Sequence, residues 1–382
     1  MRKIGYLFFL FLLLVACTSI PVRTQNPKDP KLTLPEKCFI EGIKIEQGQS
    51  FTDCVPVALE TIFKFYSVNM DREEISNQIQ KFEGNFRISF FPIPPTLADF
   101  LWNRLHLLNI ESVVGGLDVL HSSDWSQPPS NAFKVTTVHD LSAITYPELT
   151  DVKVVENTKR RLKWVLKEVD RIIVPSYSTK KDLQNFGADD QKIRVIPEAS
   201  NITGPAKNQK VVEFKKKYGI KRDYILSVGV SSRKNTRRIL EACRKISKEH
   251  DLGSVMIGEK WLDIDSDENV IFTGHITNEE LQAAYTGAKV LVYASICEGF
   301  GIPILEAYAC RCPVVTSNAS SMPEVAGDAA ILVDPFNSDS IAEGIKKAMQ
   351  NKKVLVKKGI VRSQKFSWEE TARATLRVYE ES

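Results

Sequence analysis

The feature that most constrains the fold of this sequence is a regular alternation of short apolar runs with longer amphipathic segments, from about residue 81 onward. Runs this short have the length of buried strands rather than of helices. Strands that alternate with helices form a parallel sheet with crossover helices on its faces. The predicted strands are 119–120, 134–138, 171–174, 193–196, 224–228, 254–257, 270–271, 290–293, 313–316 and 330–333. The sequence therefore predicts an α/β protein.

A polar segment at 201–210, with Gly204 and Pro205, divides the alternating region into two units. We expect an N-terminal Rossmann-like unit at 81–200, joined by a C-terminal helix at 366–382. A C-terminal Rossmann-like unit should occupy 201–365. The chain has 382 residues, 43% of them hydrophobic, so each unit has material for its own core.

Charge and cysteine content exclude several kinds of function. The 51 basic and 47 acidic residues give a formal charge of +4, which does not indicate nucleic acid as a partner. The basic run Lys159-Arg160-Arg161 is predicted to be a solvated helix face. The seven cysteines form no CxxC pair, so we expect mostly free thiols and neither a metal site nor a disulfide framework.

The first 17 residues are typical of a bacterial export signal. Arg2 and Lys3 precede an apolar run that ends at Ala16, and Leu14-Val15-Ala16-Cys17 resembles a lipobox. We expect lipidation at Cys17, a linker at 18–37 and membrane association at the bacterial inner membrane or through the lipid. An uncleaved signal anchor is the alternative for this segment. If the N-terminus is an artefact, the protein is cytoplasmic.

Residues 38–80 have a different pattern, in which Cys54 precedes apolar residues with helical spacing. A cysteine at a helix N-terminus has a lowered pKa and can act as a nucleophile. The segment resembles the opening of a papain-like peptidase of the bacteriocin-processing kind, with Gln49 or Gln47 as the oxyanion glutamine. No histidine follows in the matching context, and the expected glycine after the cysteine is Val55. We therefore expect a vestigial peptidase-like fragment without working chemistry.

The loop after the predicted strand at 290–293 has the clearest chemical pattern. Glu298 and Glu306 frame a turn with two glycines and with Pro303, which suits the first helical turn. Free N–H groups at such a helix start can face a diphosphate. The carboxylate of Glu306 suits hydrogen bonds from ribose hydroxyls.

Two glutamates eight residues apart resemble the E-x7-E signature of the family 4 (group 1) retaining glycosyltransferases. Four further phrases occur in the order of that family, beginning at 135, 227, 272 and 322. The resemblance implies a GT-B fold, in which two Rossmann-like domains face a cleft. The donor-binding residues it implies are Gly229, Arg233, Lys234, Gly274, Gly299, Phe300, Gly301, Ile302 and Glu306.

The resemblance also implies a reaction, the transfer of a hexosyl unit from a nucleoside-diphosphate sugar to an acceptor hydroxyl with retention. His139 would position the sugar and Glu298 would contact its hydroxyls. Arg233 and Lys234 would stabilise the leaving diphosphate, without a metal or other cofactor. The expected partners are a UDP- or GDP-linked sugar and a glycan, lipid or small-molecule acceptor.

Compared with that family, the N-terminal domain is truncated, since its first strands, glycine-rich loop and long helix are missing from the sequence pattern. Either residues 38–80 fill this gap or the reading frame is spliced or truncated; we favour the second interpretation. Two other functions stay open. The chain could be a non-catalytic lipoprotein that binds nucleotide sugar, or a glycoside hydrolase that uses Glu298 and Glu306 as its acid–base pair.

Overall fold

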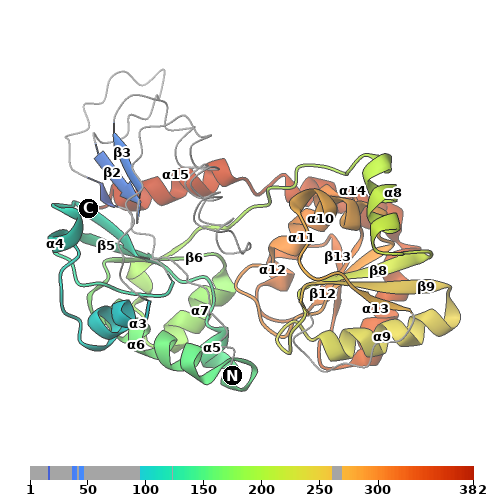
Figure 1. Cartoon of the computed structure of the whole chain (residues 1–382), viewed down its shortest axis with the longest axis horizontal. Helices are drawn as coiled ribbons and strands as arrows, with labels where there is room; N and C mark the ends of the chain where they lie inside the picture. The colour runs from blue at the N-terminus through green and yellow to red at the C-terminus, as the bar shows by residue number, and fades with distance from the viewer. Residues whose placement is uncertain (1–15, 18–36, 41–42, 47–94, 123, 260–268) are drawn as a thin grey trace, which may run out of the picture.

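A computed structural model describes residues 16–17, 37–40, 43–46, 95–122, 124–259 and 269–382 (Figure 1). The N-terminal part of this set consists of three short strands, β1 (Ala16–Cys17), β2 (Lys37–Ile40) and β3 (Ile43–Glu46), which pair antiparallel. The rest of the predicted signal, linker and peptidase-like segments lies outside the described residues. Among the helices in the described part, none has the length and apolar character needed to cross a membrane.

The N-terminal unit is built on a four-stranded parallel sheet with the order β4-β5-β6-β7. Its strands are β4 (Val119–Ser122), β5 (Phe133–Thr137), β6 (Arg171–Val174) and β7 (Ile193–Val195). Its helices are α3 (Pro95–Ala98), the π-helix η1 (Asp99–Arg104), α4 (Glu111–Val114), α5 (Ser142–Thr145), the 3-10 helix η2 (Pro147–Leu149), α6 (Val152–Glu168), α7 (Tyr177–Asn185) and the 3-10 helix η3 (Asp190–Lys192).

Helix α6 forms much of the core of this unit. Its N-cap is Asp151, whose side chain accepts a hydrogen bond from the backbone N–H of Lys153. Leu162 and Val165 on α6 pack with Ile172 of β6 and with Leu183 of α7 in one buried cluster. The sheet and these helices therefore fix the loops that follow the strands.

The C-terminal unit contains a six-stranded, fully parallel sheet with the order β10-β9-β8-β11-β12-β13. Its strands are β8 (Asp223–Val228), β9 (Leu252–Ile257), β10 (Val270–Phe272), β11 (Val290–Tyr293), β12 (Val314–Ser317) and β13 (Ala330–Val333). Its helices are α8 (Asn208–Lys217), α9 (Thr236–Glu249), α10 (Asn278–Gly287), α11 (Ile302–Ala309), α12 (Met322–Ala326), α13 (Ser338–Gln350) and α14 (Lys352–Ser363).

Both faces of the C-terminal sheet are covered, which explains why its strands are continuous apolar runs. Along β8, Leu226 packs in the cluster with α10 and α11, whereas Ile225 packs in the cluster with α9 and α13. The same alternation holds for Leu291 and Val292 on β11. The predicted α/β class with parallel sheets is confirmed.

The last helix, α15 (Trp368–Tyr379), leaves the C-terminal unit and lies against the N-terminal one (Figure 1). Thr371 Oγ1 donates to the carbonyl of Pro197 at 2.6 Å. Beyond the helix, Glu381 forms ion pairs with Arg171 and Arg194. The final residues of the chain therefore connect the two units a second time.

Candidate donor site

The loop after β11 leads directly into α11, and its local structure follows from two residue types. Gly301 has a left-handed backbone, φ 115°, and is the N-cap of α11. Pro303 occupies the first turn, where its missing N–H costs no helical hydrogen bond. Ile302 begins the helix and Glu306 lies in its second turn, as the sequence predicted. Pro303 has no N–H, and the N–H of Ile304 donates to the carbonyl of Gly301 at 3.0 Å, so in this first turn the N–H of Ile302 is the one left for a ligand at the carboxyl end of the sheet.

Glu298 is a buried carboxylate held between two cations from the loop after β8. Its Oε2 lies 2.7 Å from Arg233 Nη1, and its Oε1 lies 2.7 Å from Lys234 Nζ. Burial alone would raise the pKa of Glu298, but Lys234 and Arg233 outweigh burial and lower it to about 2. Arg233 also donates to the carbonyl of Cys297 at 2.9 Å. Glu298 therefore stays ionised at neutral pH.

The position of Lys234 depends on Gly229 and Tyr293. Gly229 has φ 87°, and a Cβ at this position would lie 2.9 Å from Lys234 Cγ, so the lysine stem crosses the space that a side chain would fill. Lys234 Nζ donates to Tyr293 Oη at 2.8 Å. Burial lowers the pKa of Lys234, although Glu298 opposes this effect. The absence of a side chain at Gly229 therefore makes room for the stem of Lys234.

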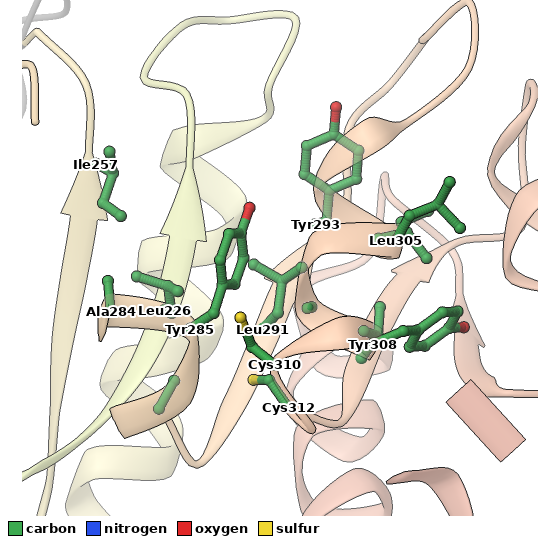
Figure 2. Close-up of a cluster of buried hydrophobic side chains, with 14 of the residues drawn as sticks. Leu226, Ile257, Ala284, Tyr285, Leu291, Tyr293, Leu305, Tyr308, Cys310 and Cys312 are labelled. Atoms are coloured by element: carbon green, nitrogen blue, oxygen red, sulfur yellow. The ribbon is translucent and has the colours of Figure 1, made fainter. Parts of the chain in front are cut away.

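Glu306 shares the same edge of the sheet with Tyr285 of α10. Tyr285 Oη donates to Glu306 Oε2 at 2.7 Å. Burial raises the pKa of Glu306, and the hydrogen bond from Tyr285 opposes it. Figure 2 shows the hydroxyl groups of Tyr285 and Tyr293 pointing toward the ends of the strands that carry Leu226 and Ile257. Tyr285 occupies one oxygen of Glu306 and fixes the direction of the other.

Gly299 was predicted to be a donor-binding residue, but the structure shows another reason why this position needs a glycine. A Cβ at Gly299 would lie 1.8 Å from the carbonyl oxygen of His139 and 3.0 Å from Asp140 Cβ. The glycine therefore admits the backbone of the N-terminal unit. The carbonyl of Gly299 accepts hydrogen bonds from Ser176 Oγ at 2.6 Å and from Thr179 Oγ1 at 3.2 Å. This loop is thus in direct contact with the other sheet.

Two other residues of the predicted donor site, Phe300 and Gly274, do not offer a side chain to a ligand. The ring of Phe300 is buried and packs edge-to-face on Phe366, at 5.6 Å between centroids. Gly274, with φ 68°, accepts a hydrogen bond from the N–H of Gly258 at 3.1 Å, in the loops after β10 and β9. Only the backbone of Phe300 therefore remains for a ligand, and the turn at Gly274 supports the same edge of the sheet.

In the N-terminal unit, His139 follows β5 and pairs with Glu198, which follows β7. His139 Nδ1 lies 2.8 Å from Glu198 Oε1. Burial lowers the pKa of His139, but the hydrogen bond and charge of Glu198 outweigh it, with Asp124 and Asp140 nearby, so the pKa is raised. Glu198 had no sequence signal, because the pair forms only when two strand ends meet.

Arg161 corrects the prediction that residues 159–161 are a solvated face. Its side chain is 1% exposed; Nη1 lies 2.7 Å from Asp124 Oδ1, and Nη2 donates to Thr136 Oγ1 at 2.7 Å. A buried guanidinium needs such partners, and Asp124 and Thr136 come from distant positions that a charge run does not reveal. Burial raises the pKa of Asp124 although Arg161 lowers it.

His121 on β4 is a second group that the sequence did not single out. Its ring nitrogens lie 2.6 Å from Tyr379 Oη and 2.8 Å from Thr137 Oγ1. Burial, with the charges of His139 and Arg161, lowers its pKa to about 3. His121 is therefore neutral at physiological pH, beside the more basic His139.

Gln49 and Cys54, the predicted peptidase-like pair, lie outside the described residues, as does the side chain of Cys17. The four cysteines whose side chains are described, Cys243, Cys297, Cys310 and Cys312, are buried free thiols. Within the described residues, no group of three or more His, Cys, Asp and Glu side chains is arranged to hold a metal ion.

Comparison with known sequences agrees with this arrangement. Residues 210–360 match the family model described as glycosyl transferases group 1, and residues 69–202 match that of glycosyltransferase family 4. O-antigen chain mannosyltransferase B of Escherichia coli is 29% identical over 281 residues, which are 68% of this chain and 74% of that protein. O-antigen chain mannosyltransferase RfbU of Salmonella typhimurium is 29% identical over 224 residues, 56% of this chain and 60% of that relative.

Comparison with solved structures finds the same fold. Anabaena Alr3699/HepE, in complex with UDP-glucose, superposes with a TM-score of 0.65 at 14% identity, over 86% of this chain and 96% of that one. Sucrose-phosphate synthase from Thermosynechococcus elongatus gives a TM-score of 0.58 at 21% identity, over 70% and 74% of the two chains. The two family-model matches lie in tandem, one on each α/β unit, so each unit is similar to a glycosyltransferase domain and the chain has a GT-B-like fold.

Proposed function

We propose that this protein transfers a hexosyl unit, with retention, from a nucleoside-diphosphate sugar to a hydroxyl group of a glycan. The observation that carries the proposal is the buried Glu298 between Arg233 and Lys234, next to the start of α11 and in the loop that contacts His139. Two cations and the N–H of Ile302 at the start of α11, all at the carboxyl end of the sheet, suit a diphosphate. The relatives are named mannosyltransferases, so GDP-mannose is the first donor that we propose. UDP-glucose, which is bound in the HepE structure, is the second.

The proposed chemistry begins with departure of the nucleoside diphosphate. The bond between the sugar C1 and the phosphate oxygen breaks, and Arg233, Lys234 and the N–H of Ile302 at the start of α11 stabilise the charge that develops on the phosphate. The acceptor oxygen then bonds to C1 and loses its proton. Because retention requires attack from the face that the phosphate leaves, a phosphate oxygen is the nearest base for that proton.

The remaining residues position the donor. Glu306, oriented by Tyr285, accepts hydrogen bonds from ribose hydroxyls. Glu298, once the phosphates engage the two cations, offers its carboxylate to hydroxyls of the transferred sugar. His139, oriented by Glu198, donates to the sugar from the opposite unit.

The hydrolase hypothesis is weaker on chemical grounds. A hydrolase needs both carboxyl groups free to act on one glycosidic bond, whereas both oxygens of Glu298 are paired with Arg233 and Lys234. Two adjacent cations also make its surroundings suited to an anion.

The test of the proposal is calorimetric titration of GDP and UDP into the full chain, together with assays of sugar transfer from GDP-mannose and UDP-glucose. Glu306→Ala should weaken binding of the preferred nucleotide about tenfold, the equivalent of about 1.4 kcal/mol. The matched control is Glu343→Ala, an exposed glutamate on α13. Unchanged affinity for both nucleotides in Glu306→Ala would refute the ribose assignment. Binding without transfer to any glycan acceptor would favour a protein that only binds nucleotide sugar.

A further inference from the structure

The N-terminus of α7, in the N-terminal unit, is capped by a carboxylate from the C-terminal unit. The N–H of Tyr177 lies 3.1 and 3.0 Å from the two carboxylate oxygens of Glu324, and the N–H of Ser178 lies 3.4 Å from one of them. Ser176 caps the third donor of this turn, the N–H of Thr179. A carboxylate is the group that the partial positive charge of a helix start favours.

The same turn of α7 also holds the donor loop. Ser176 and Thr179 are buried, and both hydroxyls donate to the carbonyl of Gly299. Next to this contact, the carbonyl of His139 occupies the space in front of Gly299. The boundary of the two units therefore has two polar contacts, the Glu324 carboxylate at the start of α7 and the α7 hydroxyls on Gly299. It also has one close backbone approach, between His139 and Gly299. In Figure 1, α7 and α12 lie on the facing sides of the two units.

Glu324 is fixed within its own unit and cannot simply follow α7. Arg362 of α14 donates to the carbonyl of Glu324 at 2.5 Å and to that of Val325 at 3.0 Å. At the other end of α12, the N-cap Ser321 donates to the carbonyls of Glu298 and Phe300, at 3.0 and 2.7 Å. Helix α12 and the donor loop thus form one hydrogen-bonded piece, and Glu324 connects that piece to α7.

We propose that Glu324 is a positioning residue for sugar transfer, because it locks α7 onto the donor loop and so holds His139 beside Glu298. This inference rests on the proposed function. The residues assigned to the nucleotide, Arg233, Lys234 and Glu306, all belong to the C-terminal unit and do not depend on the lock. Transfer needs groups from both units, and misplacement of about 1 Å between reacting groups can cost a hundredfold in rate.

The test compares Glu324→Ala and Glu324→Gln with the control Glu343→Ala in the full chain. In Glu324→Ala we expect kcat to fall at least tenfold, while calorimetric affinity for GDP or UDP stays within twofold of the wild-type value. Glu324→Gln keeps an oxygen acceptor at the helix start and should recover part of kcat. A circular-dichroism melt checks that each variant is folded. Unchanged kcat in Glu324→Ala, or a parallel loss of kcat and nucleotide affinity, would overturn the inference.

A second measurement separates this inference from the proposed function. Small-angle X-ray scattering should show a larger radius of gyration for Glu324→Ala than for the wild type and for Glu343→Ala, because the units are less firmly held. If scattering of Glu324→Ala superposes on that of the wild type, the lock does not exist. If the wild type binds no nucleotide and transfers no sugar, the proposed function fails and scattering alone decides whether Glu324 holds the units together.

Discussion

The carboxyl ends of the two sheets carry charged groups that are organised in different ways. In the C-terminal unit, a single carboxylate, Glu298, pairs with two cations that are adjacent in sequence, Arg233 and Lys234, which leaves one net positive charge. In the N-terminal unit, two charged pairs form one to one between distant parts of the chain, His139 with Glu198 and Arg161 with Asp124. The first arrangement gathers positive charge for a shared ligand. The second orients individual side chains, so we assign nucleotide binding to one unit and sugar positioning to the other.

The largest expected effect comes from Gly299, where the two regions touch. Gly299→Ala would place a Cβ 1.8 Å from the His139 carbonyl, and backbone cannot yield by that much without moving one unit. We expect transfer to fall about a hundredfold, with a much smaller loss of nucleotide affinity. Steady-state kinetics and calorimetry on the same preparation measure both. Gly204→Ala, which has open space around it, is the control; equal losses in the two variants would argue against contact between the units at Gly299.

The second effect concerns the stability of the C-terminal cluster. Glu298→Ala leaves two largely buried cations without their counter-charge, and breaking such a pair costs about 2 to 4 kcal/mol after allowance for partial exposure of the cations. Urea denaturation at pH 7 measures this loss in the free energy of unfolding. The control is Glu343→Ala. A change under 0.5 kcal/mol, within about the range of ordinary surface substitutions, would mean that Glu298 is not the counter-ion of Arg233 and Lys234.

The pH dependence of that stability has a definite sign. Because the folded-state pKa of Glu298 is about 2, below the ordinary value of 4.5, its contribution is present above pH 4.5 and is lost as the pH falls toward 2. In Glu298→Gln this part of the acid sensitivity should disappear. An identical slope in the wild type and in Glu298→Gln between pH 4.5 and 2 contradicts the assignment.

The smallest effect is expected at the N-terminal pair. Glu198 raises the pKa of His139, so its contribution to stability is present below pH 6.5 and is lost as the pH rises through the raised folded-state pKa. Glu198→Gln should lower the pKa of His139 and cost about 1 kcal/mol below pH 6.5. NMR titration of the His139 ring, assigned with His139→Gln, measures the pKa. An unchanged His139 titration in Glu198→Gln would show that the pair does not orient the ring.

Much of the C-terminal unit could be predicted from the sequence because its chemistry is local. Glu298, Gly301 and Glu306 lie within one loop and one helix, and the glycine and proline that shape the helix start are adjacent to them. The strands could be predicted because a parallel sheet covered on both faces requires continuous apolar runs. The sequence did not reveal that Glu298 and the two cations pair with each other in the structure, since 64 residues separate Lys234 from Glu298.

The strands of the N-terminal unit could be predicted, but the contacts inside it and those between the two units could not, because topology sets them. Arg161 appeared to belong to a solvated basic run, and only the approach of Asp124 and Thr136 makes its burial possible. Gly299 was interpreted as space for an anion, whereas the structure fills that space with the backbone of the other unit. Glu324 lies in the family-like phrase that begins at 322, but the sequence did not reveal its partner, which is a helix start in the other unit.

Hydrogen exchange of the full chain, measured with and without GDP or UDP, tests most directly the claim that the C-terminal unit binds the nucleotide. With the nucleotide that binds, we expect slower exchange of backbone amides in 229–234 and 298–306, and no change in α6 at 152–168. Protection concentrated in α6, or no protection of the two C-terminal loops at saturating nucleotide, would contradict the account.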